Sequence, residues 1–283
     1  MSRFHIGVIT DSFRLPFQQA VKKSREVGAH GIQLYAVDGE ISPSLTASER
    51  REAARVIAEN DLKISALCGD LGGHGFAIQQ ENAEKIEKSK KIIDLALDLG
   101  TKIVTTHIGV VPEDSSCERY KIMQDACNQL AEYACARGAY FAVETGPEPA
   151  KRLKAFLDSL SSKGIAVNLD PANLVMVTGE NPVEAVNTLK EYIVHTHAKD
   201  GVMRTKTDPE RIYNFFAEGG ISDLRLEDYF QEVPLGQGQV DFDLYLKALE
   251  DIGFHGYLTI EREVGQNPEA DIRLAVDFLK KYL

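Results

Sequence analysis

Short runs of β-branched and aromatic residues alternate along the chain with longer runs whose apolar residues recur at helical spacing. Residues 86–99 show the helical pattern, because their apolar side chains fall on one face of a helix. The expected strands cover residues 5–9, 31–35, 63–68, 102–107, 140–144, 166–170, 193–197 and 256–261. The expected helices cover residues 16–27, 47–60, 82–99, 117–137, 150–161, 182–189, 242–251 and 270–282. This alternation predicts a parallel sheet.

In four of these strands, one face becomes polar toward the C-terminal end. One alternating set is large and apolar: Phe141, Val143, Val167, Leu169, Leu258 and Ile260. The other set is small or polar: Ala142, Glu144, Asn168, Asp170, His195, His197, Thr259 and Glu261. A buried parallel strand is normally apolar on both faces, so the pattern favours a barrel with a site at its C-terminal rim. We expect one domain, a single (β/α)8 TIM barrel over residues 1–283, because the length suits that fold.

The composition narrows the function classes. The chain carries 32 Lys and Arg against 43 Asp and Glu, and this net charge of -11 argues against nucleic-acid or anionic-membrane binding. No apolar run approaches the roughly 20 residues that span a bilayer, and no apolar signal segment begins the sequence, so a cytoplasmic protein is expected. The four cysteines have no CxxC spacing, which disfavours a zinc knuckle or a disulfide framework.

The longest segment without a clear pattern covers residues 200–239, after the seventh expected strand. Five aromatic residues lie between Tyr213 and Phe230, too many for a disordered stretch. We expect a short helix or two and a lid over the mouth of the barrel, hinged by the glycines of residues 234–239. Packing on the outside of the barrel and a homodimer interface are the alternatives.

Segments 143–146, 169–173, 194–200 and 259–263 resemble the sugar phosphate isomerase/epimerase family in sequence and in spacing. That family shares the xylose isomerase-like TIM barrel with ketose 3-epimerases, hydroxypyruvate isomerase, inosose dehydratase and endonuclease IV. The resemblance implies that a divalent metal binds Glu144, Asp170, His197 and Glu261. It also implies that Glu144 and Glu261 transfer the proton from opposite sides of the substrate.

The resemblance therefore implies a metal-dependent isomerase or epimerase of a small sugar, ketose or keto-polyol that works through an enediolate. An inosose-type dehydratase on the same scaffold is an alternative, as is a barrel that binds sugar or metal without catalysis. A small-molecule carbohydrate is the expected binding partner, and the sequence leaves open whether the chain forms a homodimer. DNA repair is disfavoured, because endonuclease IV needs further histidines that this sequence lacks.

Electrostatics supports a metal independently of the resemblance. Three carboxylates and an imidazole inside an apolar barrel repel one another unless a cation or protons neutralise them. The alternative is pairing with Lys or Arg, but the inward-facing set contains neither, and Lys199 and Arg262 are expected to be solvated or salt-bridged. Oxygen-rich ligation favours Mn²⁺ or Mg²⁺, and Co²⁺ or Zn²⁺ would also be accepted.

Three further residues are expected at the substrate. His107 ends the fourth strand on the inward face, although it could instead be a hydrogen-bonded residue at the barrel top. His195 lies one layer below His197 and could orient a ligand. Asn173 stands where the epimerases and endonuclease IV carry a His, and a neutral amide can orient a hydroxyl group but cannot act as a general acid.

Overall fold

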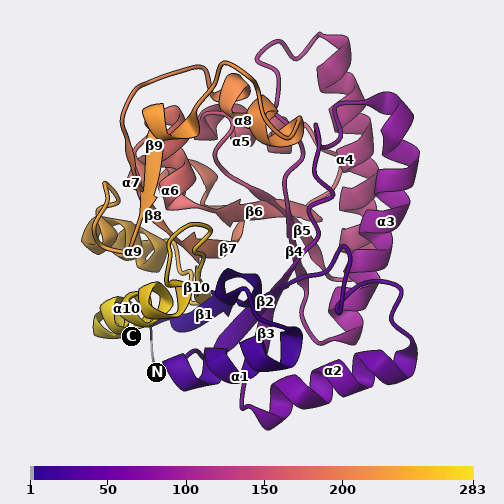
Figure 1. The fold of residues 1–283 in the computed structure, drawn as a ribbon. Helices are drawn as coiled ribbons and strands as arrows, with labels where there is room; N and C mark the ends of the chain where they lie inside the picture. The colour runs from indigo at the N-terminus through magenta and orange to yellow at the C-terminus, as the bar shows by residue number, and fades with distance from the viewer. Residues whose placement is uncertain (1–2) are drawn as a thin grey trace.

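Eight parallel strands form a closed barrel in the computed structural model, which describes residues 3–283. They are β1 (His5–Ile9), β2 (Gly31–Tyr35), β3 (Lys63–Cys68), β4 (Ile103–Thr106), β5 (Tyr140–Glu144), β6 (Ile165–Leu169), β7 (Ile193–Ala198) and β10 (Tyr257–Ile260). Their order around the barrel is β1-β10-β7-β6-β5-β4-β3-β2 (Figure 1). The predicted (β/α)8 barrel is confirmed, and each predicted strand matches an observed one within one residue at either end.

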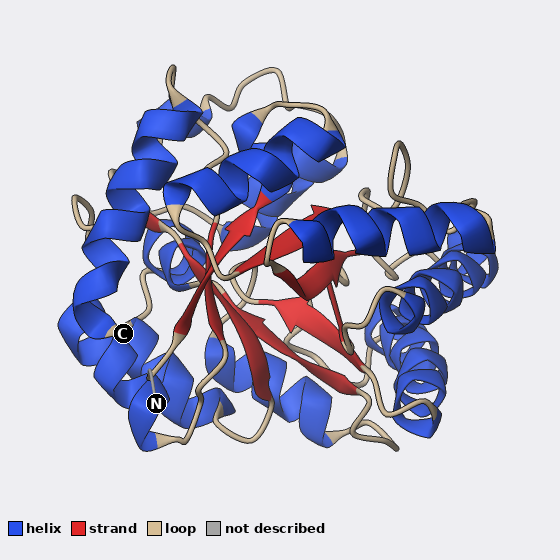
Figure 2. Ribbon diagram, turned by 90° about the horizontal axis from the view of Figure 1, so that it is seen from below, coloured by secondary structure: helices blue, strands red, loops and turns tan. Residues whose placement is uncertain are grey.

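The helices surround the ring of strands (Figure 1), and the view turned by 90° shows the strands lengthwise among them (Figure 2). They are α1 (Phe17–Val27), α2 (Ala47–Glu59), α3 (Gln79–Asp98), α4 (Glu118–Ala136), α5 (Ala150–Asp158), α6 (Pro171–Asn173), α7 (Pro182–Leu189), α8 (Pro209–Ala217), α9 (Phe242–Asp251) and α10 (Pro268–Leu279). Sequence signals explain several starts: Thr46 and Glu49 form a capping box at α2, and proline occupies the first turn of α7, α8 and α10. No helix among residues 3–283 is both long enough and apolar enough to cross a membrane.

The two faces of the strands divide as their alternation predicts. Phe141, Val143, Val167 and Leu169 are at most 1% exposed and belong to the apolar core around the barrel. The opposite face turns into the barrel, where strand register sets the polar side chains beside one another. Glu144 is the register partner of Asn168, and His197 is the partner of Thr259. The pairing of neighbouring strands therefore brings residues far apart in sequence to one end of the barrel.

The segment after β7 is more ordered than the sequence indicates. β8 (Asp200–Met203) pairs antiparallel with β9 (Phe230–Val233), and α8 lies between them with the short 3-10 helix η3 (Leu226–Asp228). The helix was expected, but the strand pair was not, because four residues carry too little pattern to identify a strand. The Tyr213 hydroxyl of α8 donates to the carbonyl of Gly73, 3.1 Å away, in the loop after β3. This contact joins the segment to the rim of the barrel, and the exterior-packing alternative is wrong for α8.

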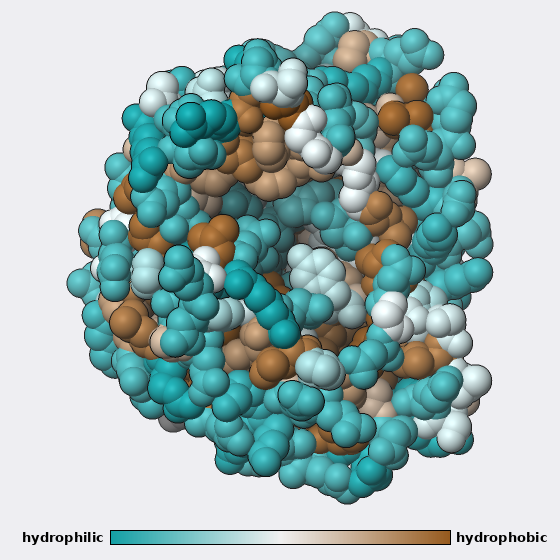
Figure 3. Space-filling model, viewed as in Figure 1, coloured by the Kyte–Doolittle hydropathy of each residue, from teal (hydrophilic) through white to brown (hydrophobic). Residues whose placement is uncertain are grey.

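The face seen in Figure 3 is hollowed at its centre, over the strands labelled there in Figure 1. Hydrophilic surface lies within the hollow, and apolar surface borders it on the side of α8. The polar ends of the strands are thus accessible from solvent beneath an apolar edge.

Candidate active site

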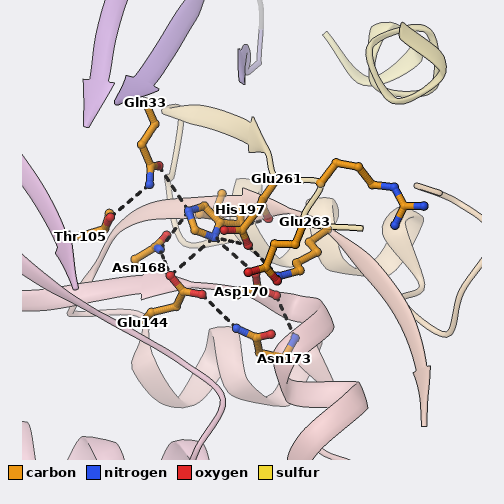
Figure 4. Close-up of polar contacts among 12 residues, drawn as sticks. Gln33, Thr105, Glu144, Asn168, Asp170, Asn173, His197, Glu261 and Glu263 are labelled. Carbon is orange, nitrogen blue, oxygen red and sulfur yellow. Dashed lines mark hydrogen bonds and ion pairs between the residues drawn. The ribbon is translucent and has the colours of Figure 1, made fainter. Parts of the chain in front are cut away.

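Four side chains from four strands meet at one end of the barrel. They are Glu144 at the end of β5, Asp170 just after β6, His197 on β7 and Glu261 just after β10. One ligand atom from each lies within 4.8 Å of every other, and all four side chains are at most 9% exposed. Figure 4 shows their polar ends pointing toward one another. The sequence prediction that these residues converge agrees with this geometry.

His197 lies at the centre of this cluster. Its Nδ1 is 3.3 Å from Asp170 Oδ2, 3.3 Å from Glu261 Oε2 and 3.7 Å from Glu144 Oε2. Burial lowers the pKa of His197, but the charges of Glu261 and Glu144 outweigh it and hold the pKa well above its ordinary value. With no metal bound, an imidazolium therefore neutralises part of the carboxylate charge.

Glu144 is held by two neutral amides. Asn173 Nδ2 donates to its Oε1 at 2.9 Å, and Asn168 Nδ2 donates to its Oε2 at 3.1 Å. Burial raises the pKa of Glu144 to about 7, against the opposing charges of His197 and His107. The close approach of Asn173 needs Gly146, where a Cβ atom would lie 2.7 Å from the Asn173 Cβ.

Asn173 was predicted to contact substrate, and its amide instead contacts Glu144. Its backbone N–H also donates to Asp170 Oδ1 at 2.9 Å, because Asp170 is the N-cap of α6. One short helical turn thus positions two members of the cluster. Contact between Asn173 and the substrate remains a proposal.

Glu261 has a charged partner that the sequence did not reveal. Lys199 Nζ lies 2.9 Å from Glu261 Oε2, and the Lys199 side chain is only 4% exposed. Burial raises the pKa of Glu261, but Lys199 and His197 reverse this and bring the pKa well below its ordinary value. The ion pair agrees with the expectation that Lys199 is solvated or salt-bridged, and for Glu261 it realises the alternative in which a carboxylate pairs with a lysine. Lys199 has the parity of His195 and His197, so continuing the period of two past the end of β7 would have placed it inward.

His107 lies beside the cluster and is partnered by Asp70. Their Nδ1 and Oδ2 atoms are 2.9 Å apart, and His107 Nε2 lies 3.8 Å from Glu144 Oε1. Burial lowers the pKa of His107, but Glu144 and Asp70 raise it to about 10. The ring of Tyr213 lies 6.4 Å from that of His107, centroid to centroid. This group forms one wall of the mouth next to Glu144, and it shows His107 as a hydrogen-bonded residue at the barrel top. Contact between His107 and the substrate stays a prediction.

A polar layer lies beneath the cluster. His195 Nε2 is 2.8 Å from Gln33 Oε1, which is also 3.3 Å from His197 Nε2, and Gln33 donates to Thr105 Oγ1 at 3.1 Å. His195 is 2% exposed, and burial lowers its pKa well below the ordinary value. His195 thus lies where it can orient His197 through Gln33, in agreement with the expected deeper layer, and its contact with the substrate stays a prediction.

Residues 21–282 match the xylose isomerase-like TIM barrel family, a range that contains the whole cluster. The chain belongs to this family. L-ribulose-5-phosphate 3-epimerase from Escherichia coli O157:H7 (strain EC4115 / EHEC) is 23% identical over 244 residues, which cover 82% of this chain and 76% of that protein. Inosose dehydratase from Clostridium beijerinckii is 23% identical over 154 residues, which cover 52% of this chain and 48% of that protein.

A solved structure gives the same result for the fold. The xylose isomerase domain protein from Planctomyces limnophilus superimposes with a TM-score of 0.80, covering 99% of this chain and 96% of that one at 24% identity. The relatives of this xylose isomerase-like barrel thus include a sugar epimerase and a dehydratase.

The donor set of this xylose isomerase-like barrel fits a divalent ion. Ligands on opposite sides of an octahedral Mg²⁺ lie about 4.2 Å apart, and the four ligand atoms here lie within 4.8 Å of one another. If Nδ1 of His197 faced the ion, its Nε2–H would face Gln33 Oε1, an outer partner of the kind that fixes a ligating His. Carboxylate oxygens favour Mg²⁺ or Mn²⁺, and the imidazole also allows Co²⁺ or Zn²⁺.

The structure also reveals site residues that the sequence reasoning missed. Asp70 follows β3 by two residues, and Gln33 lies on β2 with an inward side chain. An acidic residue just past a strand end is a signal of the same kind as Asp170 and could have identified Asp70. Gln33 offers no such signal, because a single amide inside a barrel strand has no distinctive spacing.

Proposed function

We propose that this protein is a divalent-metal-dependent isomerase or epimerase of a small polyhydroxylated carbonyl compound. The observation that carries the proposal is the convergence of Glu144, Asp170, His197 and Glu261 on one point within a barrel of this family. Four buried ligands around one point are unusual in a protein that only binds a sugar. The likeness to a sugar epimerase over 82% of the chain supports the same substrate class.

A divalent ion held by these four side chains would polarise the substrate carbonyl and offset the negative charge that develops when the adjacent C–H loses its proton. Glu144 and Glu261 are the two residues that we assign to proton transfer. Their surroundings differ, since amides hold Glu144 and Lys199 holds Glu261. Burial keeps the pKa of Glu144 raised despite the charges of His197 and His107, whereas Lys199 and His197 lower that of Glu261, so Glu144 is the better base.

The remaining residues orient these groups and the substrate. Asn173 fixes Glu144, and Asp70 fixes the ring of His107, which leaves His107 Nε2 facing the mouth beside Glu144. We assign His107 to a substrate hydroxyl next to the reacting carbon. Tyr213 covers this wall from α8 and would limit the access of water during proton transfer.

A dehydratase is the second candidate, because inosose dehydratase matches about half of this chain. Both reactions begin with loss of a proton beside a carbonyl, and they differ in whether the proton returns or a β-hydroxyl group leaves as water. Loss of water creates a conjugated carbonyl that absorbs in the ultraviolet, whereas epimerisation leaves the spectrum nearly unchanged.

The test is a panel of ketoses and inososes incubated with Mn²⁺ and followed by chromatography and absorbance. We expect epimer or isomer formation without a rise in absorbance. On any substrate that reacts, Glu144→Gln and Glu261→Gln should each lower turnover by about 10²–10⁴-fold, the usual contribution of a general base or acid. Near-normal rates in both variants would refute the assignment, and a rise in absorbance would establish the dehydratase.

A further inference from the structure

The loops after β7 and β10 lie where (β/α)8 barrels often hold a phosphate group, since loops after strands seven and eight commonly form that site. Phosphate is held there by backbone N–H groups of a glycine-rich turn and by nearby cations. This chain has both elements, because glycines recur in residues 234–239 and Lys199 and Arg262 follow the two strands. The structure shows what those donors bind.

The glycine-rich turn binds a carboxylate of the chain itself. Asp200 Oδ2 accepts the N–H groups of Gly236 at 3.0 Å and Gly238 at 2.8 Å. Its Oδ1 accepts those of Gly201 at 2.9 Å and Val240 at 3.2 Å. A Cβ atom on Gly238 would lie 2.1 Å from Asp200 Oδ1, so the turn is closed tightly around this group. The N–H groups that could receive a phosphate are therefore already occupied by an internal anion.

The cation that follows β7 is neutralised in the same way. Lys199 Nζ contacts Glu261 Oε2 at 2.9 Å and also contacts Glu263 Oε2 and, more distantly, Glu232 Oε2 at 4.0 Å. Glu263 is 60% exposed on its side chain, so a carboxylate stands between Lys199 and solvent. A ligand approaching this side of the mouth meets Glu263 before it meets the ammonium group.

Arg262, which follows β10, is engaged on two sides. Its Nη1 donates to Glu232 Oε1 at 2.5 Å, and its Nε donates to Asp271 Oδ2 at 2.8 Å. Arg14 at the same rim donates to the carbonyls of Glu263 at 3.0 Å and Gly265 at 3.1 Å. These contacts join loops of the protein to each other and direct Nε and Nη1 of Arg262 and both Nη atoms of Arg14 at protein oxygens.

The imidazole of the opposite wall is paired as well. His107 Nδ1 lies 2.9 Å from Asp70 Oδ2, and His107 Nε2 lies 3.8 Å from Glu144 Oε1. Carboxylates thus flank both nitrogens of this ring, and sugar hydroxyl groups can donate to such carboxylates.

We propose that the substrate is an uncharged polyhydroxylated ketone or aldehyde without a phosphate group, because internal carboxylates occupy the glycine-turn amides and the rim cations that would hold one. This inference rests on the proposed function and narrows its substrate class. By this inference the substrate differs from that of the relative L-ribulose-5-phosphate 3-epimerase, whose name specifies a 5-phosphate.

The test measures dissociation constants and kcat/KM for matched pairs on the Mn²⁺-loaded protein: L-ribulose with L-ribulose 5-phosphate, and D-fructose with D-fructose 6-phosphate. We expect the free sugar to be preferred at least tenfold in any pair that binds. A tenfold preference for the phosphorylated member would overturn the inference while leaving the proposed function intact.

A titration with inorganic phosphate tests the inference independently of any reaction. If no sugar of the panel reacts, that result counts against the proposed function alone. The titration is made with and without EDTA, because phosphate can bind Mn²⁺ directly. Wild type should bind phosphate no more tightly than about 10 mM in EDTA, and Glu263→Gln, which uncovers Lys199, should bind it at least threefold more tightly. Glu269→Gln removes one exposed charge from α10 and is the matched control, expected to resemble wild type. Submillimolar phosphate binding by wild type would overturn the inference, as would equal binding by the two variants.

Discussion

Oε2 of Glu261 lies 2.9 Å from the Lys199 ammonium and 3.3 Å from Nδ1 of His197, so one carboxylate oxygen faces two groups that carry positive charge. Glu144, its counterpart across the cluster, faces the amides of Asn168 and Asn173 on its two oxygens. The site is therefore asymmetric before any metal binds. This asymmetry is the basis for assigning different roles to the two glutamates.

Removing Lys199 should destabilise the metal-free protein. In Lys199→Met, Glu261 and Glu232 lose a buried cation, and breaking a buried pair costs about 3–5 kcal/mol of unfolding free energy. Urea unfolding in EDTA measures this loss, and Mn²⁺ should restore more stability to the variant than it adds to wild type. Lys247→Met, which removes an exposed i,i+4 pair with Asp251, is the control and should change stability by less than about 1 kcal/mol. Equal effects of the two substitutions would contradict the role given to Lys199.

Removing the amide of Asn173 should impair turnover more than stability. Asn173→Ala frees one oxygen of Glu144 but keeps the backbone bond to Asp170, so the ligand set stays in place. A hydrogen bond to a charged group contributes about 1.5–3 kcal/mol, which corresponds to a fall in kcat of roughly 10- to 100-fold. Mn²⁺ affinity should change much less than kcat, and calorimetry checks this. Asn187→Ala on α7 serves as the control, and a loss of Mn²⁺ binding as large as the loss of kcat would show that Asn173 is structural.

Glu148 should make stability fall as the pH rises. Its carboxyl group is 2% exposed, accepts the N–H of Val111 at 3.0 Å, and has its pKa raised from 4.5 to about 7, chiefly by burial. The folded state therefore binds more protons than the unfolded state between pH 4.5 and 7, so ionisation destabilises the fold there. Between pH 4.5 and 7, ionisation of Glu148 lowers the free energy of unfolding by about 3 kcal/mol. Glu148→Gln keeps an acceptor for Val111 without the charge, and its stability in EDTA should vary correspondingly less with pH. Parallel pH profiles for wild type and variant would contradict this account.

Tyr213 should matter for substrate binding if α8 closes the mouth. Tyr213→Ala removes both the ring near His107 and the hydrogen bond to Gly73, so KM should rise several-fold while Mn²⁺ affinity stays unchanged. Phe216→Ala on the same helix is the matched control, because Phe216 is 61% exposed. An unchanged KM in Tyr213→Ala would rule out the lid. A change in solution mass in Phe216→Ala would instead indicate that the exposed aromatic surface forms the expected homodimer interface.

The sequence predicted the barrel and the cluster because both depend on strand alternation, which is a local property. Glu144 and His197 lie on strands, and Asp170 and Glu261 follow strands by one residue, so the period of two still placed them inward. Lys199 also follows its strand by one residue, in the parity of His195 and His197, so the same reasoning would have placed it inward. Asp70 lies two residues past β3, where the backbone direction is set by turns. Glu148 and Gln33 depend on contacts with loops and strands distant in sequence, which only the packed barrel defines.

The Asp200 contacts show a second limit. The glycines at 236 and 238 were read as hinges, whereas their N–H groups bind a carboxylate and close the turn. The same glycine pattern fits a flexible hinge and a turn packed closely against another group. The group that decides is Asp200, which lies 36 residues before Gly236 and 38 residues before Gly238.

The central claim is that this cluster, with a divalent ion, removes a proton from carbon beside a carbonyl. Deuterium incorporation from D2O into a ketose such as L-ribulose or D-fructose, followed by proton NMR, tests it without requiring the natural substrate. We predict exchange at the carbon next to the carbonyl with Mn²⁺, little exchange in EDTA, and a fall of at least 100-fold in Glu144→Gln. Wild-type protein that retains Mn²⁺ and binds the ketose, yet gives no exchange, would contradict the account.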